Sequence, residues 1–365
     1  MKIPITKPYF DDKEIAAAAK VIESGWVAQG PKVAEFENKF SEYVHSKNSI
    51  AVSSGTAALH LALIALGIHE DDEVIVPSFS FIATANAVVY VNVKPVFADI
   101  DPATFNIDPK DIAGKINRKT KAIIAVHQVG LPADMNSINT IGRDHGIPVI
   151  EDAACALGSQ YADRRIGDSD NIACFSFHPR KVITTGEGGM ITVNDDETAD
   201  LLRSLRNHGA NQDSEEYARI GFNFRMTDIQ AAIGLEQLKK LDFILSRRRQ
   251  LAQRYSEAFQ ENENLIPPAE PPDSVPNYQS YILRIKDSSP VNRDRMIELL
   301  HEKGIAAKKG IQAIHREKAY VERYGKVSLP ETERAADTTA ILPLYPQMTD
   351  KDIECVIDTV LSGNL

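Results

Sequence analysis

Cysteine is scarce in this sequence, and the few cysteines present cannot form a framework. Cys155, Cys174 and Cys355 are odd in number and show no Cys-x-x-Cys spacing. This excludes a set of disulfides and argues against structural zinc. The nine histidines form no H-x-x-H or H-x-x-x-H pair, which argues against a catalytic metal site. We therefore expect a metal-free protein of a reducing compartment.

The sequence also lacks an excess of positive charge and a long apolar run. Lys and Arg total 41 against 51 acidic residues, and the net charge of -10 argues against nucleic acid or an anionic membrane as partner. The longest apolar stretch, residues 57–68, contains His60 and is too short to span a bilayer. Prolines and charges interrupt the first 14 residues, so no signal peptide is recognisable. We expect a soluble, cytoplasmic protein.

What the sequence does contain is an alternation of short β-branched runs and helical patterns from residue 48 to about residue 195. This alternation is typical of an α/β fold with a largely parallel sheet. Candidate strands are 49–53, 73–77, 94–99, 121–127, 148–152, 172–177 and 189–193, and candidate helices are 56–66, 81–90, 109–116 and 135–145.

A proline cluster separates a second, smaller region. Residues 228–259 have helical periodicity, and their basic run 247–249 is interpreted as a solvated helix face. Prolines crowd residues 267–276 and predict a boundary. Beyond it we expect a strand at 278–285 and helices at 293–303 and 351–361. The predicted domains are a large one, residues 1–245, and a small α/β one, residues 246–365, with the N-terminal arm 1–30 in contact with the small domain.

Lys181 has the clearest chemical context in the chain. It follows Ser176 by five residues and precedes the glycine-rich run TTGEGGM at 184–190. An amine on a flexible stem can bond covalently to an aldehyde cofactor, while a nearby hydroxyl and close-packed glycines suit a phosphate-bearing ligand. A solvated surface lysine is the competing interpretation.

Three strand ends supply groups that would complete such a site. Residues 53–59 form a small-residue turn that opens a helix, so the N–H groups of Gly55 and Thr56 can hold a phosphate. Asp152 ends an apolar strand and can pair with a protonated pyridine nitrogen. Phe81 follows another strand end and can stack on a planar ring. Taken singly, the turn and Asp152 also fit helix caps, and Phe81 fits a core aromatic.

Together these segments resemble the DegT/StrS family of pyridoxal-phosphate (PLP) sugar aminotransferases, which have the fold type I of aspartate aminotransferase. The resemblance covers nearly the whole chain and implies a large domain with a mostly parallel seven-stranded sheet, flanked by helices, plus a smaller C-terminal α/β domain. The motifs that carry it are SGWVAQGP at 24–31, SGTAAL at 54–59, PSFSFIAT at 77–84, EDAA at 151–154, FSFHPRK at 175–181, TTGEGGM at 184–190, NFRMTD at 223–228 and ILPL at 341–344.

The resemblance implies roles for the cofactor-binding residues. Lys181 attaches the PLP covalently and then moves the proton between the cofactor and the substrate carbon. Asp152 pairs with the pyridine nitrogen, and Phe81 covers the ring. The residues implied to bind the phosphate are Gly55, Thr56 and Ser176.

The resemblance also bears on partners and on the substrate. Asn223 is implied to reach the phosphate of the neighbouring subunit, so a homodimer with a shared active site is expected. Trp26 and His315 are candidates for lining the sugar pocket. Two departures stand out: Cys155 replaces a glutamine that many relatives have near the cofactor hydroxyl, and residues 310–315 lack the usual aromatic-rich stretch.

The implied activity is amino transfer from L-glutamate, which leaves as 2-oxoglutarate, to a nucleotide-linked keto-deoxysugar. The product would be an amino sugar for a surface polysaccharide or a secondary metabolite. Some family members are sugar dehydratases with a histidine at the lysine position, so Lys181 favours transamination. A non-catalytic regulator that binds a sugar nucleotide is an alternative of another class, although this acidic chain offers no DNA-binding segment.

Overall fold

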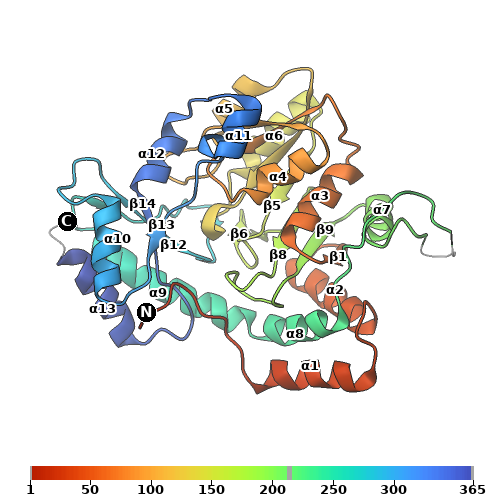
Figure 1. The fold of residues 1–365 in the computed structure, drawn as a ribbon, viewed down its shortest axis with the longest axis horizontal. Helices are drawn as coiled ribbons and strands as arrows, with labels where there is room; N and C mark the ends of the chain where they lie inside the picture. The colour runs from red at the N-terminus through yellow and green to blue at the C-terminus, as the bar shows by residue number, and fades with distance from the viewer. Residues whose placement is uncertain (1, 212–215, 363–365) are drawn as a thin grey trace.

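A seven-stranded sheet forms the centre of the larger part of the molecule (Figure 1). The structure is a computed structural model that describes residues 2–211 and 216–362. The strand order is β1-β9-β8-β5-β4-β2-β3, and β9 alone runs antiparallel to its neighbours. The predicted mostly parallel sheet is confirmed, with strand ends shifted by at most one residue. The strands are β1 (Asn48–Val52), β2 (Glu73–Pro77), β3 (Lys94–Ala98), β4 (Thr120–Val126), β5 (Val149–Asp152), β8 (Ile172–Ser176) and β9 (Gly189–Val193).

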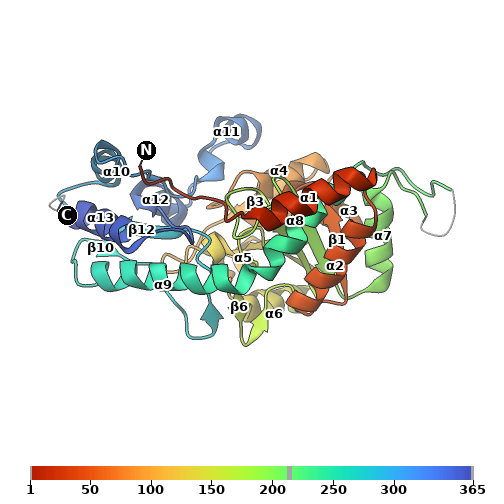
Figure 2. The ribbon, with the colours of Figure 1, turned by 90° about the horizontal axis from the view of Figure 1, so that it is seen from below.

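Helices cover both faces of this sheet (Figure 2). Successive strand residues point to opposite faces, so Val74 and Val76 join the core under α3 and α4, while Ile75 joins the core under α5 and α6. Within the described residues, none of the helices has both the length and the apolar content needed to cross a membrane. The helices around the sheet are α1 (Asp12–Ser24), α2 (Pro31–Val44), α3 (Gly55–Ala65), α4 (Ala83–Tyr90), α5 (Pro109–Lys115), α6 (Met135–His145), α7 (Asp196–Arg206) and α8 (Asp228–Lys239).

A second, antiparallel sheet of four strands, in the order β10-β12-β14-β13, organises the C-terminal part. The predicted strand over 278–285 begins only at Tyr281, since Tyr278 has a φ of +50° that is incompatible with an extended strand. A short ribbon, β11-β6-β7, lies beside the large sheet. The remaining elements are β6 (Gln160–Tyr161), β7 (Arg164–Arg165), β10 (Leu265–Ile266), β11 (Ser274–Val275), β12 (Tyr281–Ile285), α10 (Arg293–Glu302), β13 (Lys308–Lys309), α11 (Lys318–Tyr324), α12 (Pro330–Thr338), β14 (Thr339–Leu342) and α13 (Asp350–Leu361).

The long helix α9 (Leu241–Phe259) runs from one part of the molecule to the other (Figure 2). It contacts α8 in the large part and α13 in the small part, and Lys240 separates it from α8, so residues 228–259 form two helices. The N-terminal segment lies against the small part, where the N–H of Ala306 donates to the carbonyl of Ile3. The predicted boundary between residues 245 and 246 falls inside α9, and the division into two domains stays a prediction.

Arg248, in the middle of α9, is buried rather than solvated. Its side chain is 1% exposed, and Nη1 donates to the carbonyl oxygens of Tyr278, Gln279 and Leu344, each at 3.1 Å. Burial lowers the pKa of Arg248 to about 10, which leaves the guanidinium charged at neutral pH. The interpretation of residues 247–249 as a solvated face is therefore wrong at its central residue.

We expect Arg248→Ala to lower the free energy of unfolding by about 3 kcal/mol, because three buried carbonyl oxygens lose their donor. Denaturation in guanidinium chloride, followed by circular dichroism, measures the change. Arg254→Ala is the matched control on the same helix. Arg254 pairs with the exposed carboxylates of Asp350 and Glu354, so its loss should cost less than about 1 kcal/mol. Equal losses in the two variants would contradict the role given to Arg248.

Candidate active site

A cavity of about 590 Å³ lies at the carboxyl ends of the parallel strands, where open α/β sheets place their ligands. The large sheet and α3 provide one wall, and β13 and β14 of the small sheet provide part of the other. Six of the residues predicted for the cofactor line this cavity together. They are Gly55, Thr56, Phe81, Asp152, Ser176 and Lys181.

The N-terminus of α3 forms a cradle suited to phosphate. Ser54 caps the helix by accepting from the N–H of Ala57 at 3.1 Å, which leaves the N–H groups of Gly55 and Thr56 without helical partners. The backbone of Gly55 closely approaches Ser176, since a Cβ added to this glycine would lie 2.8 Å from the Cβ of Ser176. Two amides, two hydroxyls and the positive helix end can together hold an anion here.

Asp152 is held at the floor of the cavity with its charge uncompensated. Its side chain is 5% exposed, and Oδ2 accepts from the hydroxyl of Thr84 at 2.8 Å. The Thr84 hydroxyl in turn lies 2.8 Å from that of Ser80, and the N–H of Ala154 donates to Oδ1 at 3.2 Å. In the described part of the chain, no lysine or arginine pairs with this carboxylate. It can therefore stabilise a cationic ring placed in the cavity.

Lys181 and Cys155 meet at the cavity wall. The Nζ of Lys181 donates to the Sγ of Cys155 at 3.2 Å, and the Lys181 N–H donates to the carbonyl of His178 in a tight turn. A hydrogen bond to sulfur is weak, so the Lys181 side chain stays available for covalent chemistry. Phe81 faces the cavity with 67% of its side chain exposed, which suits a ring that stacks on a ligand.

Thiol labelling gives a direct check of this geometry. We expect iodoacetamide to modify Cys155 in cofactor-free protein and to leave it unmodified once the cavity is filled with PLP. Cys355 is exposed and should react in both states, whereas burial raises the pKa of Cys174 and should keep it unreactive in both. Peptide mass mapping reads all three sites in one experiment. Equal labelling of Cys155 with and without PLP would show that the cofactor binds elsewhere.

Three predicted residues lie away from this cavity. Trp26 is 60% exposed and packs beside Gly30. His315 is 2% exposed, with Nδ1 at 2.7 Å from the hydroxyl of Ser78 and Nε2 at 3.3 Å from Glu333. The structure therefore brings neither Trp26 nor His315 to the cavity of its own chain, and buried polar contacts account for the histidine. Asn223 is exposed and accepts from the Nε of Arg225 at 3.1 Å, so its predicted contact with a second subunit stays a prediction.

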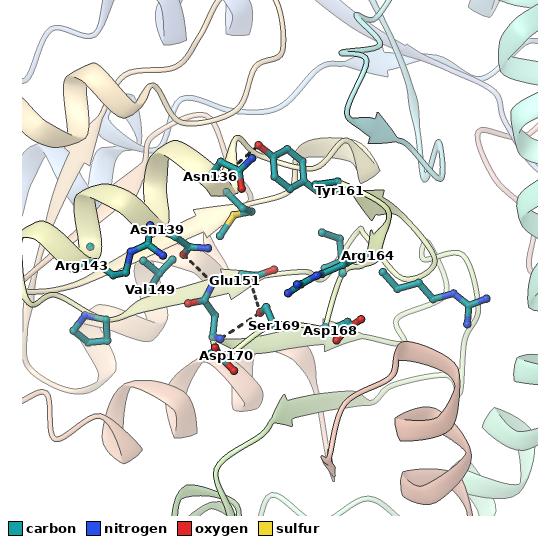
Figure 3. Close-up of a pocket in the computed structure, with 18 of the residues that line it drawn as sticks. Asn136, Asn139, Arg143, Val149, Glu151, Tyr161, Arg164, Asp168, Ser169 and Asp170 are labelled. Carbon is teal, nitrogen blue, oxygen red and sulfur yellow. Dashed lines mark hydrogen bonds between the residues drawn. The ribbon is translucent and has the colours of Figure 1, made fainter.

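A second cavity, of about 860 Å³, lies on the opposite side of β5, and Glu151 points toward it (Figure 3). Glu151 and Asp152 are neighbours on one strand and therefore face opposite ways. The Glu151 carboxylate accepts from Ser169 at 2.7 Å and from Asn171 at 2.8 Å. Burial alone would raise the pKa of Glu151, but hydrogen bonds from His127, Asn171 and Ser169 hold it below its usual value.

His127 fixes the other oxygen of Glu151. The N–H of Ala133 donates to Nδ1 of His127 at 3.0 Å, so the ring proton of the neutral histidine sits on Nε2, which faces Glu151 at 3.1 Å. The backbone N–H of His127 donates to the backbone carbonyl of Asp152. This buried network therefore anchors the end of β5 that carries Asp152, and its polar groups are already satisfied.

Sequence reasoning missed several residues that line the active-site cavity. Thr84 lies within the motif at 77–84, but its bond to Asp152 joins the first turn of α4 to the end of β5 and becomes visible only in three dimensions. Lys308 belongs to the small sheet, and no local pattern places it beside Lys181. The missed lining residues are Ser80, Thr84, Gln128, Arg180, Gln279 and Lys308.

The fold and the cavity together define a protein built to hold a phosphate-bearing aromatic cofactor beside a reactive lysine. The comparisons identify the class. The family model described as the DegT/DnrJ/EryC1/StrS aminotransferase family matches residues 8–361, so the chain belongs to this family. It is a PLP-dependent aminotransferase of fold type I.

Individual relatives are similar to this chain over nearly its whole length. An uncharacterized protein of Methanocaldococcus jannaschii is 38% identical over 372 residues, which cover 98% of this chain and 96% of the relative. The structure of the aminotransferase TlmJ from Streptoalloteichus hindustanus is 34% identical, with a TM-score of 0.93 over 99% of this chain and 98% of that one. A candidate sugar aminotransferase from Streptococcus pneumoniae has been solved with the cofactor in its pyridoxamine form; it is 29% identical, with a TM-score of 0.94 over 99% and 97% of the two chains.

Proposed function

We propose that this enzyme transfers the amino group of L-glutamate to a nucleotide-linked keto-deoxysugar, with release of 2-oxoglutarate. Sugar aminotransferases among its structural neighbours support a sugar acceptor. The observation that carries the proposal is one cavity that joins Lys181, Asp152 and the phosphate cradle. The product would be an amino sugar made in the cytoplasm for a surface polysaccharide or a secondary metabolite.

Each residue of the cavity would have a distinct role in amino transfer. When bound, PLP supplies an electron sink for the carbon that loses its proton. Asp152 would keep a proton on the ring nitrogen and so maintain the positive charge that this sink requires. Lys181 would anchor the cofactor covalently, and its amine, once displaced by the substrate, would move the proton from the substrate carbon to the cofactor. Phe81 would fix the plane of the ring, while Gly55, Thr56 and Ser176 would hold the phosphate.

Two features favour this activity over the alternatives. A dehydratase of the family would have a histidine at position 181, and a histidine cannot provide the covalent amine link. A regulator that only binds the sugar nucleotide would have no need of an amine and a carboxylate in one cavity. The retained Lys181 and Asp152 therefore support catalysis of amino transfer.

A homodimer is the second part of the proposal. Tyr217 and Ile220, close to Asn223 in the chain, are 70% and 93% exposed, and Tyr90 is 55% exposed. The neighbouring rings of Phe222 and Phe224 are stacked with centroids 5.0 Å apart. Exposed aromatic and aliphatic side chains gathered near one segment are typical of a protein–protein interface. A second subunit at this surface would bring its Asn223 toward the phosphate cradle, and sedimentation analysis would test the stoichiometry.

The first experiment is an absorbance spectrum of the PLP-loaded enzyme before and after addition of L-glutamate. A yellow, lysine-bound cofactor that bleaches as the amino group is taken up would establish the first half of the reaction. Borohydride reduction followed by peptide mapping should place the cofactor on Lys181. A spectrum that does not respond to L-glutamate or to any other amino donor would remove the aminotransferase proposal for this site.

A further inference from the structure

Three cations converge on the active-site cavity from different parts of the fold. Arg180 and Lys181 follow β8 of the large sheet, whereas Lys308 lies on β13 of the small sheet. The side chains of Arg180 and Lys308 have no hydrogen-bond or ion-pair partner among residues 2–211 and 216–362. The Nζ of Lys181 donates to the thiol of Cys155. Among the described residues, no carboxylate therefore neutralises the positive charge of Arg180 or Lys308.

The environment of Lys308 disfavours its positive charge. Burial lowers the pKa of Lys308, and the charges of Arg180 and Lys181 lower it further, while Cys155 acts in the opposite sense. A lysine in a cleft whose pKa is lowered by burial and by neighbouring cations is typical of functional sites. The adjacent Lys309 differs, because its side chain is 70% exposed and its Nζ lies 3.6 Å from Asp294.

The cofactor phosphate does not account for these cations. The cradle at Gly55, Thr56 and Ser176 already supplies neutral donors and the end of a helix, whereas Lys308 lies on the opposite, small-sheet wall beside Ile341. Two carboxylates of the described residues line the cavity: Asp152 accepts a hydrogen bond from Thr84, and Glu187 is exposed. Lys308 and Arg180 are therefore available to bind an anionic group of the substrate.

We propose that Lys308, assisted by Arg180, binds an oxyanion group of the substrate and so determines which substrates the enzyme accepts. The proposal rests on the amino-transfer function proposed above. The shared chemistry is a negatively charged oxyanion group, and two substrates could supply it. One source is the carboxylate of the amino donor, and the other is the diphosphate of the nucleotide sugar. A lysine provides a point charge that suits either group.

The test measures binding to the PLP-loaded, full-length enzyme by titration calorimetry, with 2-oxoglutarate and inorganic pyrophosphate as separate probes. We expect Lys308→Met to weaken the binding of at least one probe by about 10-fold to 100-fold, as for the loss of a charge-assisted hydrogen bond. Lys309→Met, on the same strand, should bind both probes as the wild type does. Arg180→Met should weaken the same probe by a smaller factor.

Each outcome either identifies the group that Lys308 binds or contradicts the proposal. A loss confined to 2-oxoglutarate identifies the donor carboxylate as its ligand, and a loss confined to pyrophosphate identifies the diphosphate. Unchanged affinities in Lys308→Met, or a wild type that binds neither probe, would overturn the proposal. An unchanged cofactor spectrum confirms that the variant is folded and loaded. If the wild type binds pyrophosphate through Lys308 but takes no amino group from L-glutamate, the proposed function fails and the subsite remains.

Discussion

Lys181→Ala should reduce amino transfer by about 10⁴-fold or more, because one substitution removes both the covalent anchor and the group that moves the proton. The rate is measured as 2-oxoglutarate formed from L-glutamate by PLP-loaded enzyme. The variant should still bind PLP, since the cradle at Gly55 and the carboxylate of Asp152 are intact. Its spectrum should be that of free aldehyde, with no adduct after borohydride reduction.

Two comparisons make this result specific. Lys318→Ala removes a lysine that is 87% exposed and should leave the rate unchanged. Added methylamine should restore part of the activity of Lys181→Ala, because a small amine can enter the vacated space and carry the proton. Wild-type turnover in Lys181→Ala would show that the base is another residue.

Asp152→Asn is the second change with a large expected effect. The carboxamide has no negative charge to keep a proton on the ring nitrogen, so we expect amino transfer to fall by about 10²-fold to 10³-fold. PLP should still attach to Lys181, and this can be read from the yellow colour. The variant therefore separates loss of the electron sink from loss of the cofactor.

The control for Asp152→Asn removes the same charge at the surface. Asp337 has a side chain that is 62% exposed and pairs with Arg316, so Asp337→Asn should retain full activity. Thr84→Val keeps the Asp152 carboxylate but removes its hydroxyl donor, and it should produce a smaller decrease than Asp152→Asn. A rate for Asp152→Asn within twofold of the wild type would exclude the pairing role.

The sequence was most informative where a single local pattern determines the structure. The strands of the large sheet are short, mostly apolar runs. Gly55 follows β1, Asp152 ends β5 and Lys181 follows β8, and these three strands run in the same direction, so their carboxyl ends bring the residues to one edge. The two N-terminal helices, α1 and α2, were not predicted, although Asp11 caps α1 with a capping box that the sequence displays.

Long-range contacts explain the remaining differences. Arg248 has the local pattern of a solvated charge, and only the approach of Tyr278 and Leu344 from other segments makes it a buried donor. The ring nitrogens of His315 likewise contact Ser78 and Glu333, which come from other segments of the chain. Such pairings depend on how the two sheets meet, and periodicity in one segment contains no information about that.

The cavity between the two sheets has a consequence for the cooperativity of unfolding. Asp152 and Lys181 contribute to it from the large sheet, and Lys308 and Leu342 from the small one. A ligand that contacts both walls links the two parts of the molecule for as long as it is bound. At a concentration 100 times its dissociation constant, it stabilises the folded state, which binds it, by about 2.7 kcal/mol. Heating the saturated enzyme should therefore melt both parts in a single transition, even if the empty enzyme melts in two.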